Sequence, residues 1–141
     1  MGVVDAAYGH PLKLEEEAVA YLAGGIASNG YQCGMLWGAA LAAGAQAYRL
    51  FGNGAQAEIA AILASQRLLD SFRSRAKNET DCIEITNLNF KGKIETLPIL
   101  KFIFKGGPIR CFRMAGDYAP KVFAEINATF LEENFEVPDQ L

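Results

Sequence analysis

Apolar residues recur at helical spacing in several stretches of this chain, and the pattern predicts an all-α protein. The first stretch follows Pro11 and predicts a short amphipathic helix that ends at Gly24-Gly25, with Glu15 to Glu17 in its first turn, where the helix dipole favours acids. Its apolar positions are Leu14, Ala18, Tyr21 and Leu22. Residues 1–11, which precede it, are predicted to be a loose N-terminal arm.

The two strongest helical patterns follow one another in the middle of the chain. Residues 32–51 contain mostly alanine and large apolar side chains and stop at Gly52-Asn53-Gly54, so they predict a central helix that is buried on most sides. Residues 55–77 predict a third helix with an apolar stripe on one face. Its basic residues gather toward the C-terminal end, where a solvated face complements the helix dipole.

The second half of the chain is less regular. Residues 79–95 read as a connection, because Asp81, Asn87, Asn89 and Gly92 argue against one continuous helix. Residues 96–105 suit a buried strand or a short helix; with no partner strand elsewhere, a helix is predicted. The last helix is expected to start near Asp117, to hold Pro120 in its first turn and to fray after Glu133. The expected fold is a compact bundle of about four to five helices.

Composition and charge narrow the class of protein. At 141 residues the chain is most simply a single domain, and 51% of its residues are hydrophobic. Its net charge is −3 and no basic stripe appears, so it lacks the electrostatic footprint of a nucleic-acid-binding protein. The longest uncharged apolar stretch, 33–45, is shorter than the roughly 20 residues that a transmembrane helix needs. With no signal-peptide pattern at the N-terminus, a cytoplasmic location is expected.

Cys33 stands where the central helix is predicted to begin, directly after a glycine-rich stretch, 24–30. A thiol at the first turn of a helix faces free N–H groups and the positive end of the dipole, which favour thiolate and predict a reactive cysteine. Glycine costs roughly 1 kcal/mol relative to alanine inside a helix, so Gly34, Gly38 and Gly44 predict close packing or close approach to a bound group.

The run Cys33-Gly34-Met35-Leu36-Trp37-Gly38 resembles the CGAxxG motif of the redox-active family named for its C-GCAxxG-C-C cysteine pattern. Gly44 sits where the later glycine of that family falls, and Gly24, Gly25 and Gly30 form the glycine-rich approach to the motif. Total length is similar, and Cys82 and Cys111 sit in the second half as the last two cysteines of the family do. The resemblance implies a thiol-based redox site built from Cys33, Cys82 and Cys111.

Two departures from the family pattern bear on that site. Met35 replaces the motif alanine, and no cysteine between Leu14 and Gly30 corresponds to the first cysteine of the family. If that first cysteine pairs with the motif cysteine in relatives, this chain has lost half of a dithiol.

Other chemistries for the same residues stay open at this point. Three cysteines can remain free thiols, or two of them can form a disulfide, either Cys82 with Cys111 or Cys33 with one of these two. They can also share a metal, with His10 as the fourth ligand. The spacings typical of iron–sulfur and c-type haem proteins are absent. A Cys-His nucleophile would need His10 to fold back onto Cys33.

The sequence leaves the partner and any cofactor unassigned. The glycine-rich loop at a helix start could hold an anion such as glutathione or a phosphate. A redox partner, a small molecule or a second copy of the chain are all compatible with the pattern. The alternative function is a non-catalytic helical interaction module whose glycine and alanine face packs against a partner and whose cysteines fill space.

Overall fold

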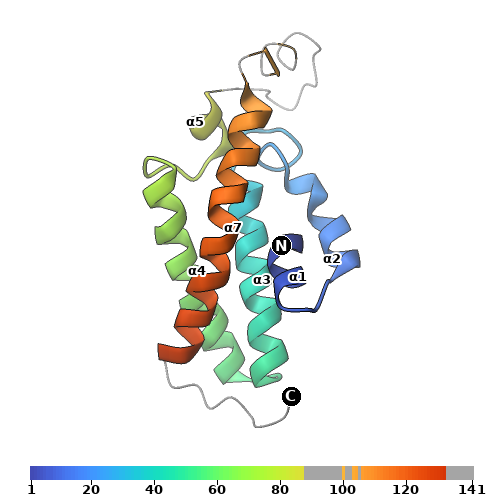
Figure 1. Ribbon diagram of the computed structural model, residues 1–141, viewed down its shortest axis with the longest axis vertical. Helices are drawn as coiled ribbons and strands as arrows, with labels where there is room; N and C mark the ends of the chain where they lie inside the picture. Colours follow the sequence, from blue (N-terminus) through green and yellow to red (C-terminus); the bar gives the residue numbers. More distant parts are fainter. Residues whose placement is uncertain (88–99, 101–102, 105, 133–141) are drawn as a thin grey trace.

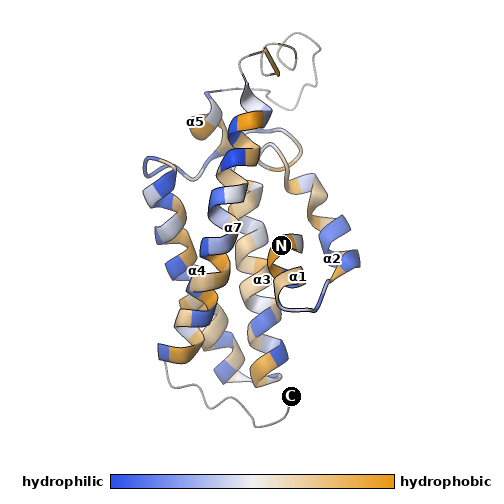
Figure 2. Ribbon diagram, viewed as in Figure 1, coloured by the Kyte–Doolittle hydropathy of each residue, from blue (hydrophilic) through white to orange (hydrophobic). Residues whose placement is uncertain are grey.

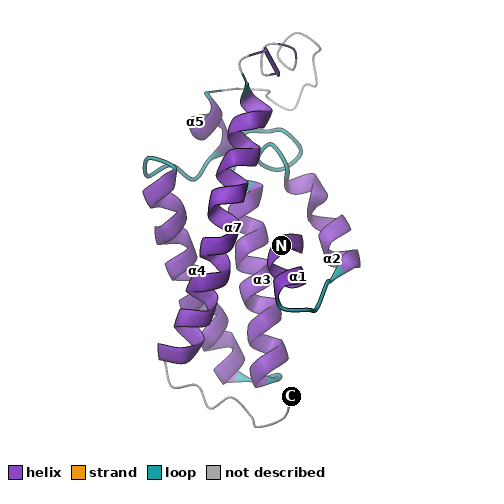
Figure 3. Cartoon of the chain, viewed as in Figure 1, coloured by secondary structure: helices purple, strands orange, loops and turns teal. Residues whose placement is uncertain are grey.

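In the computed structural model, residues 1–87, 100, 103–104 and 106–132 are described (Figure 1). Every regular element in this part of the chain is a helix, and the only β-type pairing is one isolated bridge (Figure 3). The predicted all-α bundle is confirmed. None of the helices described is both long enough and apolar enough to cross a bilayer.

The centre of the bundle is a hairpin of two long helices, α3 (Gly34–Phe51) and α4 (Ala55–Arg75). The connection of three residues forces the helices to run antiparallel, and Gly52 takes a positive φ of 70° there. Alanines on both helices are almost completely buried, which lets the two backbones approach closely: Ala42, Ala43, Ala47, Ala57, Ala60 and Ala64. Both spans agree closely with the ranges predicted from the sequence.

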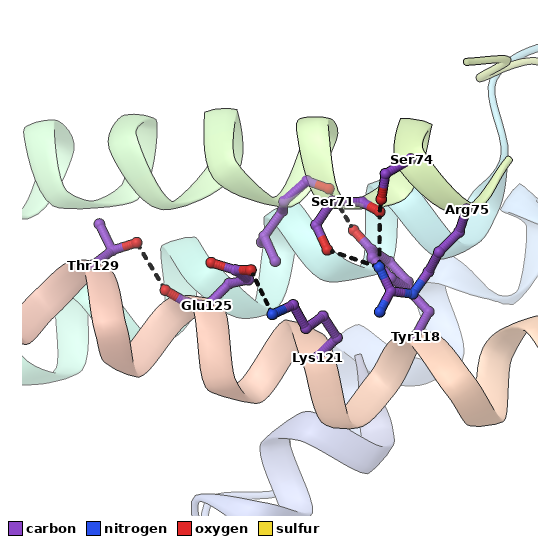
Figure 4. A network of polar contacts seen from close by, with 8 residues as sticks. Ser71, Ser74, Arg75, Tyr118, Lys121, Glu125 and Thr129 are labelled. Atoms are coloured by element: carbon purple, nitrogen blue, oxygen red, sulfur yellow. Dashed lines mark hydrogen bonds and ion pairs between the residues drawn. The ribbon is translucent and has the colours of Figure 1, made fainter. Parts of the chain in front are cut away.

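Helix α7 (Gly107–Glu132) covers one side of this hairpin (Figure 1). Phe72 of α4 packs edge-to-face against Tyr118 of α7, with ring centroids 5.2 Å apart, and Ile126 is fully buried. The Tyr118 hydroxyl donates a hydrogen bond of 2.9 Å to the Leu68 carbonyl of α4 (Figure 4). Burying each such apolar side chain contributes about 1.5–3 kcal/mol.

The predicted start of this last helix, near Asp117, is wrong by ten residues. Pro120 lies inside α7 and not in its first turn. Proline removes one helical hydrogen bond, but the apolar stripe continues on both sides of it, from Met114 through Tyr118 to Val122, and Met114 packs against the core. Tertiary packing therefore carries the helix past the proline.

The N-terminal residues are not a loose arm, contrary to the prediction. Helix α1 (Gly2–Ala7) packs against α3 and α7, and Val4 and Asp5 are only 3% and 4% exposed. Directly after α1, the Tyr8 ring packs against Phe123 at an interplanar angle of 44°, and its hydroxyl donates a hydrogen bond of 2.9 Å to Asn127 Oδ1. These contacts tie the first eight residues to the bundle.

The next helix starts behind Pro11 as predicted but is shorter and more exposed. Helix α2 (Lys13–Ala18) runs into a 3₁₀ turn, η1 (Val19–Leu22), and Leu14 and Tyr21 face solvent. The change to 3₁₀ geometry breaks the helical spacing on which the predicted apolar stripe depended. Figure 2 shows hydrophilic positions on α2 and along the outer side of α4.

The predicted connection after α4 contains one short helix, α5 (Cys82–Thr86), which ends at Asn87 in the left-handed conformation. The start of α3, α5 and the start of α7 all lie at the same end of the bundle (Figure 1). The helix predicted for 96–105 falls mostly outside the described residues, and the predicted frayed tail after Glu133 falls wholly outside them.

Candidate thiol site

Cys33 is the N-cap residue of α3, in extended conformation directly before Gly34. Its carbonyl accepts the first helical bonds, from the N–H groups of Leu36 and Trp37. The side chain points inward and is 6% exposed. The predicted position at a helix start is thus present, but the sulfur lies within the apolar core rather than on the surface.

A short antiparallel pairing brings the Cys82 segment alongside the Cys33 segment. Three backbone hydrogen bonds hold it: Cys33 N to Thr80 O at 2.8 Å, Cys82 N to Tyr31 O at 2.8 Å and Ile83 N to Gly30 O at 3.0 Å. The bridge itself joins Gln32 and Asp81. Since neighbouring side chains alternate across such a pairing, Cys33 and Cys82 fall on the same face.

On that face the two cysteines occupy diagonal positions, for which Cβ atoms are typically about 7–8 Å apart or somewhat less. A disulfide requires Cβ atoms about 3.5–4.5 Å apart. A modest local shift of the α5 segment would therefore be needed to join Cys33 and Cys82. All three cysteines are free thiols in this structure.

Cys111 reaches the same region from α7, where it lies in the second turn and is half-buried. The evidence for convergence is electrostatic: a negative charge on Cys111 raises the pKa of both Cys33 and Cys82, and a charge on Cys33 raises the pKa of Cys82. These charges therefore lie within electrostatic reach of one another. The three cysteines lie at the same end of the bundle, at the start of α3, at the start of α5 and in the second turn of α7 (Figure 1).

The pKa of each thiol is raised, which corrects the expectation that Cys33 favours its thiolate. Burial is the largest cause for Cys33, and the N–H groups of Met35 and Leu36 lower its pKa by less; neither makes a capping hydrogen bond to the sulfur. Burial raises the pKa of Cys82 to about 11 and also raises that of Cys111. Desolvation of the charged form outweighs the helix dipole here.

Two glycines of the motif allow the N-terminal segment to approach α3. A Cβ on Gly34 would lie 2.7 Å from the Leu22 carbonyl oxygen at the end of η1, and one on Gly38 would lie 3.1 Å from the Met1 backbone nitrogen. Gly44 has no neighbour within 4 Å. Close packing is therefore found at Gly34 and Gly38 but not at Gly44, and the approaching backbone belongs to the N-terminal segment in both cases.

The glycine-rich loop forms a left-handed turn in which five consecutive residues, 24–28, have positive φ. Such a run costs about 1–2 kcal/mol for each non-glycine residue. Gly25 is required, because a Cβ there would lie 2.2 Å from the Tyr31 carbonyl oxygen. Gly24 shares the positive φ, and Gly30 lies against Ile83 of α5. At Gly30 the loop thus brings the segment before Cys33 into contact with Ile83, the residue after Cys82.

Most backbone N–H groups of this loop are already hydrogen-bonded within the protein. Those of residues 26–31 all donate hydrogen bonds to carbonyl oxygens of the protein. His10, the remaining candidate metal ligand, is exposed. In the described part of the chain, no group of three or more histidine, cysteine or acidic side chains is arranged to hold a metal ion.

Sequence reasoning missed three contributors to the site. Thr80 and Tyr31 act through backbone carbonyls, so their side-chain identity carries no signal. Burial is the largest cause of the raised pKa of Tyr118, and a charge on Cys33 adds to it, so this side chain lies within electrostatic reach of the thiol. Its spacing from Val122 and Ile126 marks it as a core residue, but nothing in the sequence places it near a cysteine.

The fold and the site define a small helical protein with three cysteines gathered at one end of its bundle. Comparison with protein-family models matches residues 2–125 to the family described as "Putative redox-active protein (C_GCAxxG_C_C)". The chain belongs to this family, as the motif around Cys33 predicted. The searches of curated proteins and of solved structures gave no match.

Proposed function

We propose that the protein carries out thiol–disulfide exchange, with Cys82 as the thiol that meets the partner and Cys33 as the thiol that resolves the intermediate. The observation that carries this proposal is the backbone pairing that holds the Cys82 segment beside the Cys33 segment at one end of the bundle. Membership of a redox-active family supports it. The assignment of roles rests on exposure, because Cys82 is half-buried whereas Cys33 is buried.

The partner is a disulfide, and the electrons balance in two steps. The Cys82 thiolate attacks one sulfur of the partner's disulfide, which forms a mixed disulfide and releases the other sulfur as a thiolate that takes up a proton. Cys33, after losing its proton, attacks Cys82 Sγ, and the partner's second sulfur leaves as a thiolate. The protein dithiol is oxidised by two electrons, and the partner's disulfide is reduced to two thiols.

Cys111 takes a supporting role in this scheme. It lies close enough to raise the pKa of Cys82 when charged, so its own protonation state tunes how readily Cys82 becomes a thiolate. It also offers a second sulfur near the mixed disulfide. Its position in a long helix restricts its movement, whereas Cys82 begins a helix of five residues held mainly by backbone hydrogen bonds.

The test is oxidation with oxidised glutathione as the probe disulfide, followed by thiol counting and peptide mass mapping. We expect two thiols per chain to disappear as an intramolecular Cys33–Cys82 disulfide. The matched variants are Cys33→Ser, Cys82→Ser and Cys111→Ser: the first two should lose the intramolecular bond and the third should keep it. Three thiols that react slowly and independently would refute the exchange function, and a bond from Cys33 to Cys111 in the wild type would refute the assignment of Cys82.

The pH dependence gives a second readout. With a pKa of about 11, on the order of one Cys82 thiol in a thousand is ionised at pH 8, so alkylation in the folded protein should be slow and should rise about tenfold per pH unit up to the pKa. Iodoacetamide labelling read by mass spectrometry measures this rate. Rapid labelling of Cys82 at neutral pH would contradict the environment described above.

A further inference from the structure

Helix α3 carries large apolar side chains on the side that faces solvent, as well as on its buried side. Its most exposed positions are Trp37, Leu41 and Tyr48, each 41% exposed, while its amide residue Gln46 is buried. A helix that borders solvent normally places polar side chains there. Exposed apolar side chains that line up on one face mark an interaction surface.

The spacing of these residues is that of a helix–helix seam. Trp37, Leu41, Gly44 and Tyr48 follow one another at intervals of four, three and four residues, which is the heptad spacing of paired helices. Gly44 contributes open space at this seam, with no atom within 4 Å of an added Cβ. On α4, Ile59 and Ile62 are also more than half exposed.

We propose that this seam binds a second copy of the chain, with the two α3 helices antiparallel across a twofold axis. The seam is symmetric about the point between residues 42 and 43, so an antiparallel copy places Trp37 against the partner's Tyr48. The same arrangement places Leu41 in the space above the partner's Gly44. A self-complementary patch of this kind is what a twofold interface requires.

Charge is compatible with a second copy, and size predicts a weak interface. The four seam positions carry no charged side chain, so a copy brings no like-charge repulsion onto the seam. The seam belongs to α3 alone, and an 18-residue helix is about 27 Å long and about 10 Å wide. The flat area is on the order of 300 Å², which is below the roughly 800 Å² of accessible surface per partner in a stable interface, so the expected dimer is a weak one.

The test is sedimentation of the reduced protein over a dilution series, combined with tryptophan fluorescence. Trp37 is the one tryptophan in the chain, so its emission reports on the seam alone. We expect a dimer whose emission shifts to longer wavelength as dilution produces monomers. A wild-type protein that is monomeric at high micromolar concentration would overturn the proposal.

Matched variants test the surface and the register. Gly44→Glu adds a charge where the monomer has open space, so it should fold and sediment as a monomer. The control is Gly116→Glu on α7, another helical glycine with no neighbour within 4 Å, which should stay dimeric. A Gly44→Glu protein that dimerises as well as the control would refute the seam.

Register is tested by mixing Gly44→Glu with Leu41→Lys. In the proposed pairing one chain's new glutamate faces the other chain's new lysine, while the second Leu41–Gly44 contact stays native. Each variant alone should be monomeric and the equimolar mixture should form a heterodimer. Failure of the mixture to associate, with both variants helical by circular dichroism, would refute the antiparallel register. None of these measurements depends on thiol chemistry.

Discussion

Both halves of α3 contain glycine, but the surroundings of the glycines differ between the two halves. In the first half, Gly34 and Gly38 are covered by the backbone of the N-terminal segment, and the Cys33 thiol is enclosed beside them. In the second half, Gly44 faces open space between exposed Leu41 and Tyr48. A small residue in a helix thus indicates a close approach only where another segment of the fold is present to make it.

The largest effect that separates the two halves is expected for Gly34→Ala. The new Cβ would lie 2.7 Å from a backbone oxygen that cannot move alone, and overpacking of this kind costs about 1–3 kcal/mol. Alanine recovers roughly 1 kcal/mol of helix propensity, so we expect a net loss of up to about 2 kcal/mol in the free energy of unfolding. Urea denaturation measures it. An unchanged stability would mean that η1 yields freely and that the first half of α3 is not enclosed.

Gly44→Ala is the matched substitution in the open half. Since nothing of the same chain lies within 4 Å, the helix propensity should appear almost undiminished in the monomer, at protein concentrations below the dimer's dissociation constant, as a gain of roughly 1 kcal/mol. Urea denaturation of both variants side by side gives the contrast directly. A loss at Gly44 similar to that at Gly34 would erase the distinction between the halves.

Tyr118→Phe tests how α7 packs against α4 beside the buried first half of α3. The substitution removes the hydrogen bond to the Leu68 carbonyl and keeps the ring packing against Phe72, so we expect a loss of about 0.5–1.5 kcal/mol. Thermal unfolding measures the loss. The yield of the disulfide between Cys33 and Cys82 should stay at the wild-type level, because Tyr118 contributes no bond to either cysteine segment; a lower yield would show that the hydroxyl positions the thiols.

The smallest effect concerns Asp5, in the helix that covers Gly38. Burial is the largest cause of its raised pKa; the Met1 amino group lowers the pKa, and the charges of Glu16 and Glu15 raise it. Because the folded-state pKa lies above the unfolded value of 3.8, folding favours the protonated acid, and stability falls as pH rises through the folded pKa. Asp5→Asn should flatten this fall. Melting temperatures measured from acid to neutral pH check it, and an unchanged slope would contradict a buried Asp5.

Much of the fold was predictable because local signals and tertiary packing agree in the central hairpin. The turn at Gly52-Asn53-Gly54 and the alanine-rich pattern set α3 and α4 to within two residues at each end. The same reasoning failed where packing overrides local preference. Pro120 was expected in a first turn and lies inside α7, and α1 is too short to show a periodic pattern.

For the candidate site, the sequence suggested which residues to consider but not their environment. The motif identified Cys33, and the family pattern added Cys82 and Cys111. The helix dipole suggested an acidic thiol at Cys33, but the degree of burial that reverses this effect depends on α7 and on the 80–83 segment, which are distant in sequence. Trp37, Leu41 and Tyr48 are large and apolar, so the sequence predicted a helix buried on most sides. Each of the three is 41% exposed in the structure.

The pairing of residues 30–33 with residues 80–83 is made by backbone atoms, apart from the need for glycine at position 30, where φ is positive. Side chains at Tyr31, Thr80 and Asp81 can therefore drift during evolution without separating the two cysteine segments. We therefore expect related chains to vary widely at these three positions and still to hold the two cysteine segments side by side. Sequence identity alone would then underestimate how well the structure at this end of the bundle is conserved.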